Sequence, residues 1–298
     1  MKVLIIILNY NSQKNILICL NSFKKLEIGN WKLKTVVVDN ASSDASVEAV
    51  KKNFPNIKII CNYKNLGFAE GNNVGIRWGI KENYDYFLLL NNDTLVKKDF
   101  LIQLLKLIQK NKKTGIVSPK IYFAPGYEYH KKRYKNSDQG KVIWYAGGII
   151  DWDNVLASHR GVDEVDRGQF DKAGETDFST GCCCLIKREV FKKIGFFDKK
   201  YFLYWEDVDL CQRAKKAGFK ILYIPKAIVW HKNAESSAVG SQLHDYYLSR
   251  NRLLFGFKYT SLRVKISLIR ESVKLLRKGR QGQKAGIKDF FLCHFGKR

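Results

Sequence analysis

Three short apolar runs in the first hundred residues each end in a cluster of amide, hydroxyl and carboxylate side chains. The clusters are Asn9-Tyr10-Asn11, Asp39-Asn40-Ala41-Ser42-Ser43-Asp44 and Asn91-Asn92-Asp93-Thr94. In open α/β sheets, ligands bind beyond the carboxyl ends of the strands, so Asn9 and Asn92 are candidates to contact a substrate there. The carboxylate of Asp39 can accept hydrogen bonds from a ribose or a base. Alternatively, Asp39 and Asp44 only build the turn and cap the next helix.

Two further side chains at the ends of apolar runs could hold a metal ion. Asp93 ends the third cluster, and His231 ends a late apolar run from Ala227. A single carboxylate at a strand end is an ordinary Mg²⁺ or Mn²⁺ ligand when a substrate diphosphate supplies further oxygens. A histidine nitrogen in the same site would favour Mn²⁺. The alternative for His231 is a structural histidine with no metal.

A second group of acids follows the aromatic run Tyr201-Phe202-Leu203-Tyr204-Trp205. Glu206, Asp207 and Asp209 fall at the start of a predicted helix, where the helix dipole alone favours acidic residues. Asp209 can pair with Arg213 one turn later. In a pocket walled by aromatic side chains such as Trp205, one of these carboxylates could act as a general base. Dipole and burial move the pKa of such an acid in opposite directions.

Glycine and cysteine patterns exclude some functions. The first apolar run is not followed by the glycine-rich turn of a dinucleotide-binding fold. Gly67, Gly71, Gly75 and Gly79 instead recur every four residues, which requires one narrow helix face, either for packing on a strand or for approach of a ligand. The seven cysteines are an odd number and include no CxxC pair, so we expect buried, reduced thiols rather than zinc or disulfides.

Alternating elements must position these side chains. Apolar runs predict strands, and periodic segments with capping residues predict the helices between them. The expected strands are 3–8, 35–39, 57–61, 86–91, 221–224 and 227–231, and the expected helices are 12–25, 45–52, 69–80, 98–110, 188–194 and 207–217. Continuous apolar strands alternating with helices indicate an α/β fold with a mostly parallel, Rossmann-like sheet covered on both faces.

The pattern of the 298-residue chain changes at about residue 115 and at about residue 245. Regular alternation of strands and helices covers residues 1–115, a less regular region covers 116–245, and a basic helical extension over 246–298 follows. Lys and Arg (53) exceed Asp and Glu (28) by 25, and residues 248–298 alone hold 14 basic and 2 acidic residues. This excess predicts a polyanionic partner: a nucleotide, an anionic membrane surface or nucleic acid.

The basic excess includes a helix predicted at Leu262–Lys278. Its apolar stripe comprises Leu262, Ile266, Ile269, Val273 and Leu276. Such a helix suits an anionic membrane surface, but it could equally pack on the catalytic domain with a solvated basic face. No nucleic-acid recognition motif accompanies it, so we expect no nucleic-acid partner. Apolar runs are too short to span a bilayer or form a signal peptide. We therefore expect a cytoplasmic protein, with peripheral contact at the inner face of the cell membrane as an option.

Taken together, the motifs resemble glycosyltransferase family 2, and within it a rhamnosyltransferase-like branch. The resemblance covers roughly residues 2–255. It is carried by five segments in order, with Trp230-His231 and Arg250-Asn251 in support: residues 36–44, Asn65-Leu66-Gly67-Phe68-Ala69, Leu89-Leu90-Asn91-Asn92-Asp93, Gly181-Cys182, and residues 202–210 (FLYWEDVDL).

The resemblance implies a GT-A fold, a nucleotide-diphosphate-sugar donor, a divalent metal (Mg²⁺ or Mn²⁺) and inversion at the anomeric carbon. It also implies that residues 1–245 are the catalytic domain, with a nucleotide-binding half at about 1–115 and an acceptor-binding half at about 116–245. Asp39 then contacts the nucleotide, Asp93 and His231 bind the metal, and Asp207 is the catalytic base. Asn91 and Asn92 depart from the pattern, because many relatives carry aspartate there. The remaining substrate-side candidates are Asn9, Asn65, Gly67, Asn92, Trp205, Glu206 and Arg250.

The expected activity is transfer of a sugar, rhamnose by resemblance, to a hydroxyl of a glycan or lipid-linked acceptor in surface polysaccharide biosynthesis. Two other functions remain open: a non-catalytic basic binding module on the same fold, and a nucleotidyltransferase. Convergence of Asp39, Asp93, Asp207 and His231 on one pocket would argue against the binding module.

Overall fold

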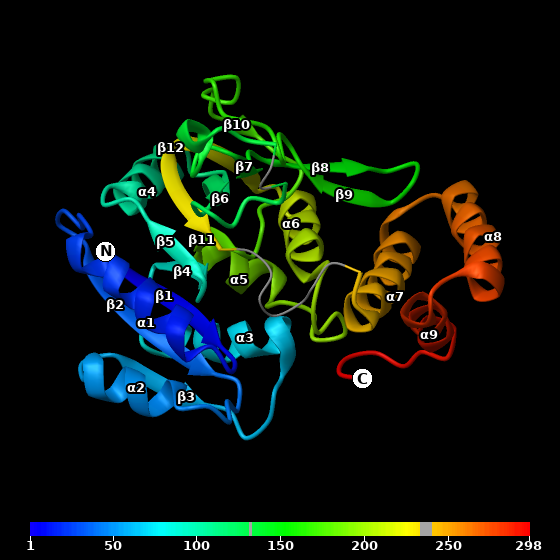
Figure 1. The fold of residues 1–298 in the computed structure, drawn as a ribbon, viewed down its shortest axis with the longest axis horizontal. Helices are drawn as coiled ribbons and strands as arrows, with labels where there is room; N and C mark the ends of the chain where they lie inside the picture. Colours follow the sequence, from blue (N-terminus) through cyan, green and yellow to red (C-terminus); the bar gives the residue numbers. More distant parts are fainter. Residues whose placement is uncertain (131–132, 233–239) are drawn as a thin grey trace.

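The computed structural model describes residues 1–130, 133–232 and 240–298, and these residues form an α/β fold (Figure 1). Its strands are β1 (Lys2–Asn9), β2 (Lys32–Asp39), β3 (Lys58–Cys61), β4 (Tyr86–Asn91), β5 (Thr94–Val96), β6 (Thr114–Phe123), β7 (Ile143–Tyr145), β8 (Gly148–Asp151), β9 (Leu156–His159), β10 (Gly174–Glu175), β11 (Cys183–Lys187) and β12 (Lys220–His231).

Helices flank the sheet and form the C-terminal part. They are α1 (Gln13–Ser22), α2 (Ser46–Asn53), α3 (Gly67–Lys81), α4 (Phe100–Lys110), α5 (Arg188–Ile194), α6 (Glu206–Lys216), α7 (Gln242–Tyr259), α8 (Leu262–Lys278) and α9 (Gln281–Phe291), with short 3₁₀ turns at Phe23–Lys25 and Asn136–Asp138. The predicted α/β class is confirmed.

One mixed sheet carries most strands, in the order β10-β12-β6-β11-β4-β1-β2-β3, with β5 on β12 and β7 on β6. Strands β4, β1, β2 and β3 run parallel, and the register pairs Asn9 with Asp39 and Leu8 with Asn91. The three polar clusters therefore lie side by side at one edge, as predicted. In β1 the residues on both faces are buried, so layers cover the sheet on each side.

The glycine face of α3 packs on β1. A Cβ on Gly71, Gly75 or Gly79 would lie 2.6, 2.7 or 2.4 Å from the side chains of Leu8, Ile6 and Leu4, respectively. Four helical residues rise about 6 Å and two strand residues about 6.6 Å, so the two repeats nearly match. Packing on a strand, the structural interpretation of this spacing, is confirmed for these three positions.

In the second half the structure contains strands that were not predicted, β6 to β11, and joins two predicted strands into one. Strand β6 is buried along its whole length but was not predicted, because Ser118, Pro119 and Lys120 interrupt its apolar pattern. The ammonium of Lys120 is paired with Asp166 at 2.6 Å and with Asp171 at 2.5 Å. The two late strands predicted separately are one strand, β12, whose register on β6 shifts between Ile224 and Ile228. Proline at position 225 lacks an N–H, which suits a bulge.

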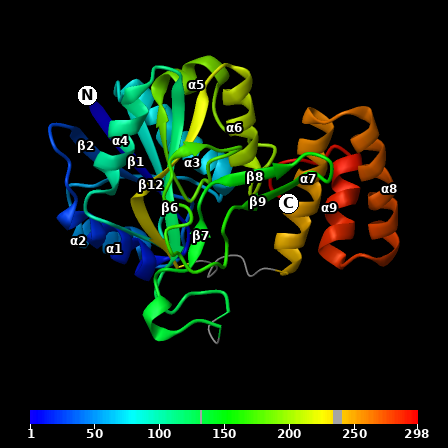
Figure 2. The same cartoon turned by 90° about the horizontal axis from the view of Figure 1, so that it is seen from above.

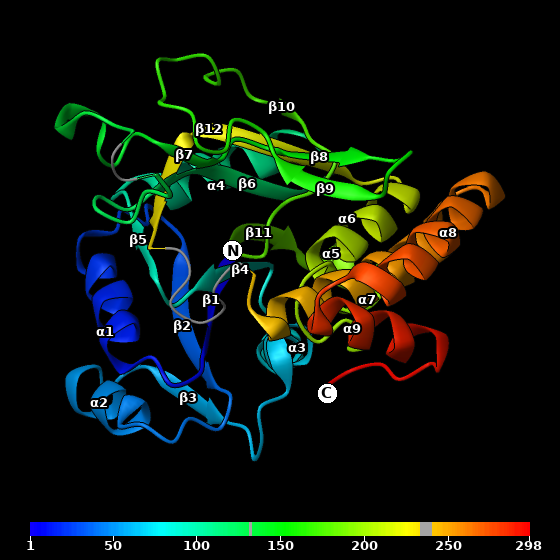
Figure 3. The ribbon, with the colours of Figure 1, turned by 45° about the vertical axis from the view of Figure 1, so that its right-hand side comes forward.

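The C-terminal helices α7, α8 and α9 pack side by side beyond the edge of the α/β part (Figures 2 and 3). Among the described residues, every helix is too short or too polar to cross a bilayer. All seven cysteines are free thiols. Five are buried as expected, but the prediction is wrong for Cys61 and Cys293, which are exposed. Both lie where an element ends, at the edge of the packed core.

Candidate active site

Residues from all three polar clusters form one hydrogen-bonded unit, called here the amide cluster (Asn9, Asp39, Asn40, Ser42 and Asn92). Asp39 is 2% exposed, and its carboxylate accepts hydrogen bonds from Ser42 N at 2.8 Å, Ser42 Oγ at 2.6 Å and Asn9 Nδ2 at 3.2 Å. Asn92 Nδ2 donates to Asn9 Oδ1 at 2.8 Å. The turn-building role of Asp39 is therefore present, and its contact with a nucleotide stays a prediction.

Asn65 and Gly67 connect this cluster to the aromatic run. Asn65 Oδ1 accepts from Asn40 Nδ2 at 3.1 Å and from Gly67 N at 2.8 Å. Gly67 has φ +77°, and a Cβ there would lie 2.5 Å from the carbonyl oxygen of Phe202. That carbonyl accepts from Phe68 N at 2.7 Å. Only glycine fits this close approach, so Gly67 sets the distance between the two loops.

Asp93 and His231 meet as predicted for a metal pair. The distance from His231 Nε2 to Asp93 Oδ1 is 3.1 Å, and the two side chains are 6% and 16% exposed, respectively. Burial disfavours the charged carboxylate, but attraction to His231 and Lys232 outweighs it and lowers the pKa of Asp93. Asp93 Oδ1 and His231 Nδ1 are buried without a hydrogen-bond partner. Such atoms are rare in native proteins and call for an explanation.

The donor atoms of this pair fit a divalent cation. Neighbouring ligands of an octahedral ion at about 2.1 Å are themselves about 3 Å apart, close to the separation seen here. One carboxylate oxygen and one imidazole nitrogen suit Mn²⁺ better than Mg²⁺. Within the described ranges, no group of three or more His, Cys, Asp or Glu side chains is arranged to hold a metal. Further ligands would therefore come from a substrate or from water.

Lys232 is a site residue that sequence reasoning missed. It is 8% exposed, and its Nζ donates to Asn15 Oδ1 at 3.1 Å. It forms no ion pair with a carboxylate in the described part of the chain, although its charge acts on Asp93. In the sequence, Lys232 cannot be told apart from the many exposed basic residues of this chain. Its position directly after a predicted metal ligand was the available signal.

The predicted catalytic acids begin α6. Asp207 is half-buried, and its two oxygens accept hydrogen bonds from Gly181 N and Val208 N, both at 2.8 Å. Burial raises the pKa of Asp207, and the two amides only partly oppose it. Glu206 is 4% exposed, and its Oε2 has no hydrogen-bond partner. Burial, reinforced by the negative charge of Asp207, raises the pKa of Glu206 well above its usual value.

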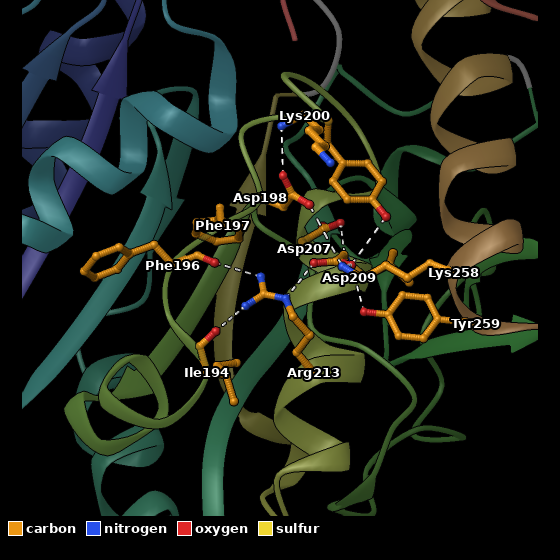
Figure 4. A network of polar contacts seen from close by, with 12 residues as sticks. Ile194, Phe196, Phe197, Asp198, Lys200, Asp207, Asp209, Arg213, Lys258 and Tyr259 are labelled. Atoms are coloured by element: carbon orange, nitrogen blue, oxygen red, sulfur yellow. Dashed lines mark hydrogen bonds and ion pairs between the residues drawn. The ribbon is translucent and has the colours of Figure 1, made fainter. Parts of the chain in front are cut away.

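Asp209 has a structural position instead. Figure 4 shows its carboxylate between Arg213 and the pair Lys258 and Tyr259. The distances are 2.8 Å to Arg213 Nε, 2.7 Å to Lys258 Nζ and 2.8 Å to the Tyr259 hydroxyl. The predicted pairing with Arg213 is confirmed. Fully satisfied and inaccessible, Asp209 joins α6 to α7.

The aromatic run before α6 is held in an unusual backbone conformation. Phe202, Tyr204 and Trp205 have φ of +62°, +67° and +74°, which is costly for non-glycine residues and persists only when surrounding contacts enforce it. Asn251 Nδ2 donates to the carbonyls of Tyr201, Leu203 and Tyr204. The ring of Trp205 is 7% exposed and lies 4.8 Å from that of Phe255 on α7.

Arg250 acts on the same turn. Its side chain is completely buried, and Nη2 donates to the carbonyls of Lys200 and Tyr201, both at 2.9 Å. Nη1 donates to the carbonyl of Gly296 at 2.8 Å. These bonds give Arg250 a positioning function toward the loop that precedes Glu206 and Asp207, and its direct contact with substrate stays a prediction.

A chain of hydrogen bonds connects the parts of the site. Asp207 bonds to Gly181 N, and the next carbonyl, of Cys182, accepts from Asn91 N at 2.9 Å. Asn91 is followed by Asn92, which bonds to Asn9, and by Asp93, which faces His231. Asp39 bonds to the same Asn9. Residues from six separate segments are thus linked, by hydrogen bonds, one ion pair and short stretches of backbone, at one edge of the sheet.

The family assignment follows from the sequence profile described as Glycosyltransferase like family 2, which matches residues 2–245. The chain belongs to this family. It is a glycosyltransferase, and the family predicted from its motifs is confirmed.

Relatives of known name share about a quarter of the residues. The N-acetylglucosaminyl-diphospho-decaprenol L-rhamnosyltransferase of Mycobacterium tuberculosis is 26% identical over 217 residues, covering 69% of this chain and 68% of that protein. The low-salt glycan biosynthesis hexosyltransferase Agl10 of Haloferax volcanii is 25% identical over 275 residues, covering 88% of this chain and 81% of that protein.

Solved structures confirm the fold of this glycosyltransferase. The crystal structure of GalNAc-T7 with UDP, GalNAc and Mn²⁺ superposes with a TM-score of 0.69 at 16% identity. The match covers 98% of this chain but only 56% of the longer protein. The expected GT-A class, a mostly parallel sheet flanked by helices with a helical C-terminal extension, is thereby confirmed.

Proposed function

We propose that this protein transfers a sugar from a nucleotide-diphosphate-sugar to a hydroxyl of a glycan or lipid-linked acceptor, with inversion at the anomeric carbon. The observation that carries the proposal is the continuous connection of Asp39, Asp93, His231 and Asp207. The Asp93–His231 pair and Glu206 contain buried polar atoms that make no hydrogen bond to the described residues, as expected where a ligand completes the bonding. A basic binding module would have no use for that arrangement.

In the proposed reaction Asp207 is the general base. An acceptor oxygen attacks C1 of the donor sugar and forms the new C–O bond. The bond from C1 to the diphosphate oxygen breaks, its electron pair leaves with the diphosphate, and the acceptor proton passes to Asp207. The raised pKa makes Asp207 a better proton acceptor than an ordinary aspartate. The amides of Gly181 and Val208 fix the direction of its lone pairs.

Asp93 and His231 would hold a divalent cation. When bound, the cation supplies positive charge that stabilises the leaving diphosphate. We assign a related function to Lys232, whose buried ammonium lies in the same region and lacks a carboxylate partner among the described residues. The side chain adds to the positive potential that attracts a diphosphate. With Asn91 and Asn92 in place of aspartate, Asp93 is the only carboxylate of its segment and would hold a cation less tightly. Lys232 would then supply part of the positive charge that the diphosphate requires.

The substrates are assigned by class. We propose a donor contacted by Asn9, Asp39, Asn65, Gly67 and Asn92, and an acceptor contacted from the side of Trp205, Glu206 and Arg250. Rhamnosyltransferase and glycan hexosyltransferase relatives support a hexose donor, rhamnose first, and a role in surface polysaccharide biosynthesis. The division proposed from the sequence is a nucleotide-binding half to about residue 115, an acceptor-binding half to about 245, and a basic extension. We place the protein in the cytoplasm.

A thermal-shift panel tests the proposal. UDP, GDP, dTDP and CMP are each added with and without Mn²⁺, and binding to the folded state raises the Tm by mass action. We expect one nucleoside diphosphate to raise the Tm by several degrees with Mn²⁺ and by less without it.

Two variants separate a metal effect from a general charge effect. Asp93→Asn should abolish the Mn²⁺-dependent part of the shift. Asp153→Asn removes an exposed carboxylate in the β8–β9 turn and should leave the shift unchanged. No shift with any nucleotide would contradict the transferase function and favour the basic binding module.

A further inference from the structure

Helix α8 has two apolar faces, and only one of them is used for packing. Val264, Leu268 and Ser272 are 8%, 3% and 2% exposed, so this face is the one turned toward the protein. Figures 1 and 2 show α8 as the outermost of the three C-terminal helices, on the side of α7 and α9 away from the sheet. The sequence left open that this helix packs on the protein with a solvated basic face, and α8 does pack on α7 and α9, through a face other than the apolar stripe.

The second face is the stripe found in the sequence. Leu262, Ile266, Ile269 and Val273 are 74%, 43%, 40% and 46% exposed. Their spacing of four, three and four residues places them along one line of the helix. Leu276, at the end of the same line, is half-buried. We call the four exposed residues the α8 stripe (Leu262, Ile266, Ile269 and Val273). The α8 stripe is about three turns long, and no other described part of the chain covers it.

Basic residues border the α8 stripe. Arg263, Arg270 and Arg277 recur every seven residues, which is close to two helical turns, and so lie along one flank with Lys274. All four are exposed. The only acid of α8, Glu271, is paired with both terminal nitrogens of Arg252, each at 2.8 Å, so its charge is offset.

We propose that the α8 stripe docks the protein on an anionic membrane surface, with the side chains of the stripe among the acyl chains and the arginines at the lipid headgroups. An apolar line flanked by arginine and lysine on a helix that lies flat on a protein matches the interfacial helix of peripheral proteins. Negative lipid headgroups complement the flank. A second copy of this chain would bring the same positive flank and repel it, and nucleic acid would leave the apolar line in water.

Docking extends the proposed function. Its biological interpretation rests on that function, but the binding of α8 to a membrane does not. Lipid-linked acceptors lie in a membrane surface, and docking through α8 would hold the catalytic part beside them. Arg250 and Asn251 of α7 brace the turn before Asp207, so the docked helices are rigidly joined to the site. The surface itself can be tested without any sugar substrate.

The experiment is vesicle flotation of the full-length protein. Vesicles of phosphatidylcholine alone and with 30% phosphatidylglycerol are compared at low and high salt. We expect binding to the anionic vesicles that weakens with salt. Ile266→Gln/Ile269→Gln/Val273→Gln should reduce the partition coefficient at least tenfold. Arg263→Gln/Arg270→Gln/Arg277→Gln should reduce it as well, by about fivefold for each charge that contacts the surface.

Matched controls carry the same kinds of change elsewhere. Ile28→Gln/Val162→Gln removes exposed apolar side chains, and Lys52→Gln/Lys112→Gln/Lys113→Gln removes exposed charges; both should bind as the wild type does. Unchanged Tm and an unchanged nucleotide response would show that each variant is folded.

Three outcomes would overturn docking. They are absence of vesicle binding by the wild type, unchanged binding by the apolar triple variant, and a dimer in light scattering that this variant dissociates while vesicles stay unbound. Vesicle binding without any nucleotide response would instead contradict the transferase and leave docking intact.

Discussion

The amide cluster and the acidic parts of the site are built in opposite ways. In the amide cluster, Asp39 accepts three hydrogen bonds from the protein. The acidic parts are Glu206 and the Asp93–His231 ion pair. Here the buried atoms Asp93 Oδ1, His231 Nδ1 and Glu206 Oε2 make no hydrogen bond within the described part of the chain, although Asp93 Oδ1 lies 3.1 Å from His231 Nε2. A buried polar atom without a hydrogen-bond partner costs free energy, and of these two regions the acidic parts carry that cost. The amide cluster shapes the site, and the acidic parts remain available for a ligand.

Turnover should show the largest difference between these regions. Asp207→Asn removes the proposed base but keeps an oxygen that can accept from one of the two amides. We expect turnover to fall about 100- to 10,000-fold, since that is the usual contribution of a general base. Release of the nucleoside diphosphate measures turnover, and calorimetry measures donor affinity, which should stay within about threefold. Loss of affinity together with turnover would make Asp207 structural.

The free energy of unfolding should respond in the opposite way, because a substitution in the amide cluster should cost more stability than one in the acidic parts. Asp39→Ala leaves the amides of Ser42 and Asn9 without an acceptor, and we expect the free energy of unfolding to fall by about 2–3 kcal/mol. Asp93→Ala removes a carboxylate that makes no hydrogen bond among the described residues but forms one ion pair, with His231, so we expect a smaller loss of about 1 kcal/mol. Urea denaturation of both variants without nucleotide or metal makes the comparison. Equal losses would contradict the division of the site into satisfied and unsatisfied parts.

The smallest effect should be a pH dependence at Glu206. Its pKa is raised in the folded protein, so the folded state binds more protons than the unfolded state above the ordinary glutamate pKa. The contribution of Glu206 to stability is present at low pH and is lost as the pH rises through the raised value. The Glu206→Gln variant has no ionisable group at this position, so its stability does not contain this pH-dependent contribution. The Tm of this variant minus that of the wild type should therefore increase by a few degrees from pH 5 to pH 8; a constant difference would contradict a raised pKa.

Much of the fold could be predicted from local patterns. β4 and α5 have the predicted bounds, and β1, β2 and α4 differ only at their ends, because apolar periodicity is a local signal. The prediction failed for β6, where Lys120 is buried by partners at positions 166 and 171. No local pattern reveals a lysine whose counterions lie more than forty residues away.

Residue order alone was sufficient to identify the side chains that can do chemistry, the edge of the sheet at which they lie, and the family, because strand direction and local periodicity are short-range properties. The three-dimensional packing was needed to show which polar atoms have hydrogen-bond partners, that Lys232 is buried beside Asp93, and that α8 packs through Leu268 and not through Ile269. These outcomes depend on contacts between segments far apart in the chain, and burial and hydrogen bonding are set by such contacts.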